Sequence, residues 1–144
     1  YTDTLKLFDL VLADSAWSES TFAKAQADVD GDIQTPSAEL NAEIEAAAAR
    51  VNKPLTKARI HSSDVFYHED NVDGHREFFE KHGCVCVEME SFALFHNAKI
   101  LNKRAACLLT ISDSLVTHAE TTAQERQTSF HDMMLVALET AVAL

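Results

Sequence analysis

The chain has little of several things that particular functions require. Glycine occurs three times in 144 residues and proline twice, so there is no glycine-rich loop that would cradle a phosphate with backbone N–H groups. The 12 lysines and arginines are outnumbered by 23 aspartates and glutamates. The resulting net charge of -11 argues against broad binding to nucleic acid, which needs clustered basic side chains. No apolar run approaches the roughly 20 residues that cross a membrane. We therefore expect a soluble protein that binds neither nucleic acid nor a membrane.

Cysteine is also scarce, and its placement argues against both a disulfide framework and a metal site. Cys84, Cys86 and Cys107 lie inside apolar runs, and the first two share the parity of one strand face, which disfavours a bond between them. No Cys-x-x-Cys or His-x-x-x-His spacing occurs, so we expect no metal. Buried, reduced thiols favour a cytoplasmic protein.

What is present is an alternation of short β-rich apolar runs with helical patterns. Its length and its hydrophobic content of 47% predict one domain over residues 1–144. Such alternation predicts an α/β three-layer sandwich with a central mixed, largely parallel sheet. The expected strands are Leu5–Leu12, Leu55–Ser62, Cys84–Val87 and Arg104–Ile111, and the expected helices are 36–51, 75–82, 90–101 and 122–144. Because the first strand has nothing before it and the chain lacks an initiator methionine, we expect an N-terminally truncated fragment.

Two of the predicted strands end in acidic residues. Val87-Glu88-Met89-Glu90 closes one strand, and Ser112-Asp113 closes the next. In open α/β sheets ligands bind beyond the carboxyl ends of the strands, so two adjacent strands ending in this way predict a site. The alternative is that the acids are solvated helix caps, which is the commoner role of an acid at such a position.

Asp113 is the best candidate for proton transfer. Arg126 lies in the first turn of the following predicted helix and is close enough in sequence to approach it. A guanidinium favours the ionised carboxylate and burial favours the neutral acid, so an Asp held between these influences can release a proton during a reaction. A purely structural Asp–Arg pair is the alternative interpretation.

Three further residues favour a nucleoside as the ligand. The two acceptor oxygens of Glu90 match a pair of vicinal sugar hydroxyls. Met89 offers a soft apolar surface to a ring or sugar, and Phe66 offers a face on which a planar base can stack. Each residue alone is more simply a packing residue, whereas together they form a nucleoside-shaped constellation.

These residues carry a resemblance to the bacterial hexameric, DeoD-type, purine nucleoside phosphorylases. The chain resembles them in Val87-Glu88-Met89-Glu90, in Ser112-Asp113, in the base-side loop Ser63–Tyr67, and most specifically in the run Thr121–Phe130. The Val-Glu-Met-Glu element is shared by the wider superfamily of phosphorylases and nucleosidases. The resemblance spans essentially the whole chain and implies a nucleoside phosphorylase-like fold.

By this resemblance the activity is reversible phosphorolysis of purine ribonucleosides and deoxyribonucleosides to free base and pentose 1-phosphate. Asp113 would protonate N7 of the leaving purine, and Arg126 would assist as the last helix bends inward. Glu90, Met89 and Glu88 would contact the ribose. The purine would be lined by Phe66, Val87 and Ser112. Phosphate would be the second substrate, with no metal or organic cofactor, and the full-length protein would be a homo-oligomer, a hexamer built from dimers.

The resemblance also implies that the phosphate-binding segments precede Tyr1, so this chain is expected to be a C-terminal portion that carries the purine and ribose half of a site. Ser114-Leu115 after Asp113 departs from many relatives, with little expected effect on the chemistry. A purine nucleosidase that uses water remains an alternative, and so does a non-catalytic nucleoside-binding module. The preference between 6-amino and 6-oxo purines is left open.

Overall fold

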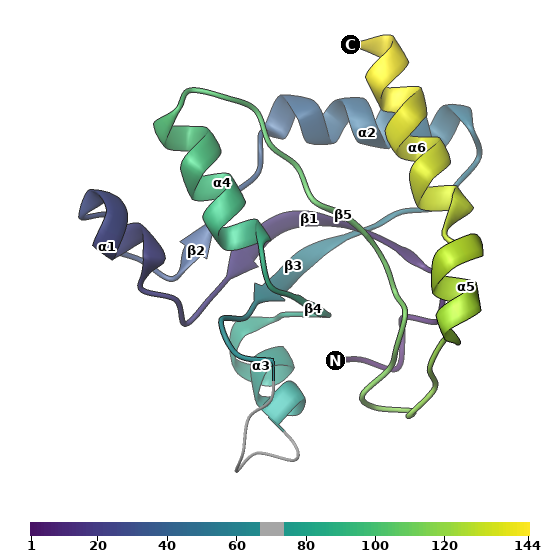
Figure 1. The fold of residues 1–144 in the computed structure, drawn as a ribbon, viewed down its shortest axis with the longest axis horizontal. Coiled ribbons are helices and arrows are strands. Elements are labelled where there is room, and N and C mark those ends of the chain that lie inside the picture. The colour runs from purple at the N-terminus through teal and green to yellow at the C-terminus, as the bar shows by residue number, and fades with distance from the viewer. Residues whose placement is uncertain (67–73) are drawn as a thin grey trace.

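A computed structural model describes residues 1–66 and 74–144 as a sheet enclosed by helices (Figure 1). The strands are β1 (Leu10–Trp17), β2 (Ile33–Gln34), β3 (Thr56–Ser62), β4 (Val87–Glu88) and β5 (Leu108–Thr110). The helices are α1 (Phe22–Ala27), α2 (Ala38–Arg50), α3 (Gly74–His82), α4 (Ser91–Ile100), α5 (Ala123–Thr128) and α6 (His131–Ala143).

The five strands form one mixed sheet, as the sequence predicts. β1 pairs with β3, and β3 with β4, in parallel, whereas β2 and β5 both pair with β1 in antiparallel fashion. The longest ladder is the parallel one between β1 and β3. The prediction that the two acid-bearing strands are adjacent is wrong, because β1 and β3 lie between β4 and β5. The acids therefore meet by another route, described below.

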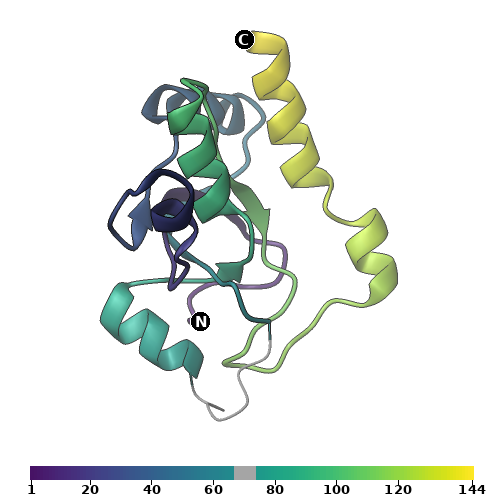
Figure 2. The ribbon, with the colours of Figure 1, turned by 60° about the vertical axis from the view of Figure 1, so that its left-hand side comes forward.

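Strand β1 builds both faces of the core because its side chains alternate. Leu12 packs in a cluster with α2 and α6, whereas Val11 and Ala13 pack in the cluster that contains α4. A shift of register between Ala13 and Ser15 inserts the exposed Asp14, so Ala16 returns to the α4 side. Figure 2 shows the helices on either side of the sheet, which gives the predicted three layers.

The predicted first strand, Leu5–Leu12, is wrong in both of its limits. Phe8 has a φ of 72°, in the left-handed region, and the N–H of Lys6 donates to the carboxylate of Asp9 at 2.8 Å. This turn delays the strand until Leu10. The strand then continues to Trp17 through a polar stretch, because the pairing with β3 is maintained beyond Asp14.

Two other strands form over fewer residues than the sequence predicts. β4 covers two residues, although the N–H of Val85 donates to Arg59 at 3.0 Å before it. β5 covers three residues, although Cys107 accepts from the N–H of Ala13 at 2.9 Å. Both segments therefore pair along the sheet further than their regular geometry extends.

The predicted final helix 122–144 is two helices, α5 and α6, which separate at Ser129 and Phe130. The hydroxyl of Thr128 donates to the carbonyl of Gln124 at 2.8 Å, a local bond that competes with the helical ladder. Helix α6 then packs against α2, and α5 lies apart from the sheet (Figure 1). The other predicted helices form close to their expected limits, and α2 starts after Ser37, whose hydroxyl accepts from the N–H of Leu40.

Candidate functional site

The predicted site residues gather around one cavity of about 660 Å³. Its walls come from residues 63, 65–66, 85–89 and 109–115, with further side chains from the N-terminal segment and from Glu120 and Arg126. All the predicted residues line it except Glu90, which directly follows the lining residue Met89. The structure thus brings together side chains that lie up to 60 positions apart in the chain.

The segment that follows β5 carries Asp113 to this cavity. It folds back on itself through an isolated bridge between Asp113 and Glu120, and the N–H of Thr121 donates to Ser112 at 2.9 Å. Closing this loop places the start of α5 beside the first residues of the loop. Asp113 and Arg126 therefore meet across a closed loop rather than across the ends of neighbouring strands.

Asp113 and Arg126 form a direct ion pair, with Nη2 of the arginine 2.8 Å from Oδ1 of the aspartate. Thr121 fixes the guanidinium, accepting from Nε through its hydroxyl at 3.1 Å and from Nη2 through its carbonyl at 3.0 Å. The second oxygen of Asp113 accepts from the hydroxyl of Ser112. The two charged side chains are 42% and 47% exposed, so a ligand in the cavity can reach them. The predicted contact forms, and its catalytic role stays a prediction.

Helix α5, which carries Arg126, is fixed at its start by a capping box. The hydroxyl of Thr122 accepts from the N–H of Glu125 at 3.2 Å, and the Glu125 carboxylate accepts from the N–H of Thr122 at 2.8 Å. The hydrogen bonds from the backbone and the hydroxyl of Thr122 hold the pKa of Glu125 below its usual range. No side chain of α5 is buried, so these bonds and the ion pair set where Arg126 lies.

Glu88 is engaged by the helix that follows it. Its carboxylate accepts from the N–H of Glu90 and of Ser91, each at 2.8 Å, and from the Ser91 hydroxyl. For this residue the helix-cap interpretation describes the contacts, since the bonds complete the start of α4. Its ribose role remains a prediction, as does that of Glu90, whose Oε2 accepts from the N–H of Met89 at 3.2 Å.

Exposed apolar side chains also line the cavity. Phe66 is 72% exposed, and Val87 and Met89 are 42% and 39% exposed. Exposed aromatic and thioether groups at a cavity can cover the faces of a planar ring. Tyr67, the last residue of the predicted base-side loop, lies outside the described residues. Cys86 also lines the cavity, and burial raises the pKa of its thiol to about 12, so it is not a nucleophile at neutral pH.

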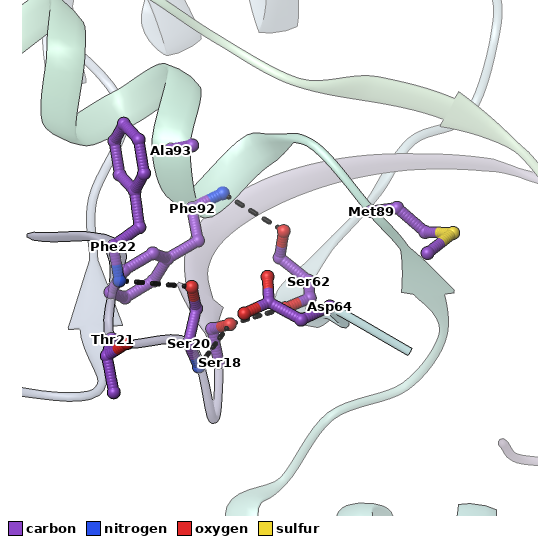
Figure 3. Close-up of a pocket in the computed structure, with 9 residues that line it drawn as sticks. All are labelled: Ser18, Ser20, Thr21, Phe22, Ser62, Asp64, Met89, Phe92 and Ala93. Atoms are coloured by element: carbon purple, nitrogen blue, oxygen red, sulfur yellow. Dashed lines mark hydrogen bonds between the residues drawn. The ribbon is translucent and has the colours of Figure 1, made fainter. Parts of the chain in front are cut away.

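A smaller cavity of about 280 Å³ lies on the other side of Met89 (Figure 3). Its hydroxyls bond to the surrounding framework. Ser18 donates to the carbonyl of Ser62 at 2.6 Å, and the hydroxyl of Ser62 accepts from the N–H of Phe92 at 3.1 Å. These contacts join the ends of β1 and β3 to α4.

The sequence interpretation missed Glu19, although it lies two residues beyond β1 and its carboxylate contacts the segment that contains Phe66. The signal was its place after a buried strand, which the misplaced limit of β1 concealed. Among the described residues no cluster of three or more His, Cys, Asp or Glu side chains is arranged to hold a metal ion. Within those same residues no helix is long and apolar enough to cross a membrane.

The family model described as "Phosphorylase superfamily" matches residues 1–144, the whole chain. The chain belongs to this superfamily. Among curated relatives, the DeoD-type purine nucleoside phosphorylase of Mycoplasma pneumoniae is 38% identical over 143 residues, and that of Dichelobacter nodosus is 36% identical over 142. These alignments cover 98% and 99% of the chain and 59% of each relative. This phosphorylase-superfamily chain thus spans about three fifths of the length of the curated relatives it matches.

A solved structure confirms the fold of the superfamily member described here. The crystal structure of purine nucleoside phosphorylase from Toxoplasma gondii in complex with immucillin-H superimposes with a TM-score of 0.79 and 17% identity. The match covers 95% of the chain and 56% of that protein. The predicted nucleoside phosphorylase-like α/β fold is therefore correct.

Proposed function

We propose that this chain provides the purine- and ribose-binding part of a purine nucleoside phosphorylase, which converts a purine nucleoside and phosphate into free base and pentose 1-phosphate. The observation that carries the proposal is the Asp113–Arg126 pair, 2.8 Å apart, at the edge of a cavity with exposed apolar walls. Similarity to DeoD-type relatives over nearly the whole chain supports it.

The reaction breaks a glycosidic bond through a transition state in which the sugar becomes cationic and the base anionic. Neutralising the charge on the departing base lowers this barrier, because the interaction strengthens as charge develops. In the proposal the ion pair opens when the nucleoside binds and Asp113 takes up a proton from solvent. Asp113 then donates this proton to N7 of the purine, and the guanidinium of Arg126 returns to stabilise the carboxylate that remains. The bond between C1′ and N9 breaks, N7 gains the proton, and phosphate forms the new bond to C1′.

The proposed substrate contacts divide between the two walls of the cavity. Phe66 and Val87 cover the faces of the purine, with Ser112 at its edge. Glu90 accepts hydrogen bonds from the ribose hydroxyls, Met89 packs against the sugar, and Glu88 supports that contact from the start of α4. These roles follow from the resemblance, and all of these residues except Glu90 line the cavity.

Phosphate is the proposed second substrate, and no organic cofactor or metal takes part. Arg126 is the one basic side chain among the described residues that line the cavity, and it is paired with Asp113. The proposal therefore assigns the phosphate to none of them. We also propose a cytoplasmic homo-oligomer, a hexamer built from dimers; Leu138 and Val142 on α6, 68% and 83% exposed, support self-association.

Release of free base from inosine and adenosine by the purified native protein tests the proposal. We expect release that depends on phosphate and yields pentose 1-phosphate in equal amount. Release at the same rate without phosphate would instead identify a nucleosidase. A third outcome is that calorimetry detects nucleoside binding to the 144-residue chain while the native protein shows no turnover under any condition. That outcome would identify a non-catalytic binding module.

A further inference from the structure

A carboxylate outside the proposed catalytic pair holds the segment that leaves β3. Glu19 follows β1, and Trp17 of β1 is in register with His61 of β3. The Glu19 side chain crosses from one strand end to the other. Its Oε1 accepts from the hydroxyl of Ser63 at 2.9 Å and from the N–H of Asp64 at 3.0 Å, and its Oε2 lies 2.8 Å from Nε2 of His61.

His61 holds that carboxylate from within the core. The imidazole is fully buried, and its centroid lies 5.1 Å from the ring of Trp17 and 4.1 Å from that of Phe78. Its Nδ1 lies 2.7 Å from the hydroxyl of Tyr1. An ionised carboxylate can only accept, so Nε2 of His61 is the donor to Glu19, and Nδ1 shares a hydrogen bond with the Tyr1 hydroxyl. Every polar atom of this buried network has a partner.

Glu19 is ionised at neutral pH although it is partly buried. Burial raises the pKa of this carboxyl, but the hydrogen bonds from His61, from its own backbone and from Ser63 outweigh burial and leave the pKa below its usual range. A carboxylate that accepts three hydrogen bonds is a strong local anchor, because charge-assisted bonds exceed neutral ones.

The anchored segment, Ser63–Phe66, forms part of the wall of the large cavity. Its first residue is also tied to β4, since the N–H of Ser63 donates to the carbonyl of Glu88 at 2.8 Å. The preceding Ser62 is fixed to α4 and to Ser18, as Figure 3 shows. Beyond Ser63 the segment has no regular secondary structure, and the N–H of Asp64 donates its hydrogen bond to the carboxylate of Glu19. The Glu19 carboxylate therefore holds the start of the segment that leads to Phe66.

We propose that Glu19, held by the buried His61, is a positioning residue for the base-facing segment Ser63–Phe66. The inference rests on the proposed function, in which Phe66 stacks on the purine. Glu19 does not touch the substrate. It restricts the segment before the nucleoside arrives, so that binding does not have to order it.

The variant Glu19→Ala removes the acceptor for three donors, among them Nε2 of the buried His61. Glu19→Gln retains the shape. Its amide oxygen accepts from Ser63 and Asp64, and its amide nitrogen donates to His61 in the other tautomer, whose Nδ1 then donates to Tyr1. The glutamine variant is therefore expected to restore most of what the alanine variant loses.

Three measurements test the inference. For Glu19→Ala we expect the Kd of the 144-residue chain for inosine to rise about tenfold, as the loss of charge-assisted hydrogen bonds implies. In the native protein the KM should rise while kcat changes little, because the chemical groups stay in place. Incorporation of 4-fluorophenylalanine at position 66 gives a fluorine NMR signal, which should shift or broaden in Glu19→Ala and return in Glu19→Gln.

Glu43→Ala is the matched control, because it also removes a carboxylate in an ion pair, here with Arg104, away from the cavity. Glu43→Ala should leave the Kd, the kinetic constants and the fluorine signal at their wild-type values. Where Glu19→Ala does not fold, Glu19→Asp keeps the charge but shortens the side chain, so that it no longer reaches Ser63 and Asp64, and it should change the same readouts. A wild-type Kd or a wild-type fluorine signal in the folded variant overturns the inference and leaves the proposed function intact. Absence of nucleoside binding and turnover in the wild-type protein overturns both.

Discussion

Replacing Asp113 by asparagine separates its chemical role from its structural one. The amide is nearly the same size, and its oxygen can still accept from Arg126, while its nitrogen can donate to the hydroxyl of Ser112. The variant keeps the local geometry but loses the transferable proton. It therefore tests whether Asp113 acts as a general acid or forms a structural ion pair.

The two roles predict effects of different size. The side chains of Asp113 and Arg126 are 42% and 47% exposed, and an ion pair this exposed contributes roughly 0–1 kcal/mol to the free energy of unfolding. Losing a general acid lowers the rate by about 10²- to 10⁴-fold. That loss raises the activation barrier by roughly 3–5 kcal/mol, well above any effect on stability.

The assay compares inosine with 7-methylinosine as substrates of the native protein. The methylated base already carries a positive charge and needs no proton at N7, so the Asp113→Asn variant should cleave it at close to the wild-type rate. Cleavage of inosine should fall by the full factor. Asp132→Asn on α6 is the control, because it weakens the ion pair between Asp132 and Lys53, which has a similar exposure. An equal loss for both substrates, or no loss for inosine, would refute the proposed proton transfer.

Three further outcomes follow from other parts of the molecule. Ile60→Ala should lower the free energy of unfolding by about 2–5 kcal/mol in a denaturant titration, because Ile60 is fully buried in the α4-side core; a smaller change would mean that the site collapses. Thr122→Ala should destabilise α5 by about 1 kcal/mol and speed amide exchange in α5 while leaving α6 unchanged. The same rate of exchange in α5 of the wild type and of the variant would contradict the capping box. Because the folded pKa of Glu19 lies below 4.5, its stabilisation is present above that pH and is lost as the pH falls through the folded pKa. The stability difference between wild type and Glu19→Gln should shrink over that acid range in melts at stepped pH, and a constant difference would contradict the shift.

The sequence predicts local features where one interaction dominates. The capping box at Thr122 and Glu125 is readable because its two partners are three residues apart, and α4 is readable from its apolar spacing. These features depend on neighbours that are close in the chain. Seven of the eight predicted site residues line one cavity, which contacts between distant segments bring together, and their roles stay predictions.

The remainder depends on contacts between distant residues. The start of β1 at Leu10 depends on a left-handed turn at Phe8, and its extension past Asp14 depends on pairing with β3. The antiparallel placement of β5 beside β1 has no local signature, so the two acid-bearing strands are wrongly predicted to be neighbours. Glu19 is missed for the same reason, because its role arises where β1 and β3 end together.

The extra residue Asp14 in β1 links the two walls of the cavity mechanically. Before it, β1 pairs with β5, which leads to Asp113; after it, β1 pairs with β3, in register up to the strand end that leads to Phe66. A change of one residue in register turns every following side chain to the opposite face of a strand. Deletion of Asp14 would therefore turn the end of β1 to the opposite face relative to β3 and displace the strand end that leads to Phe66, while the pairing with β5 that leads to Asp113 would remain.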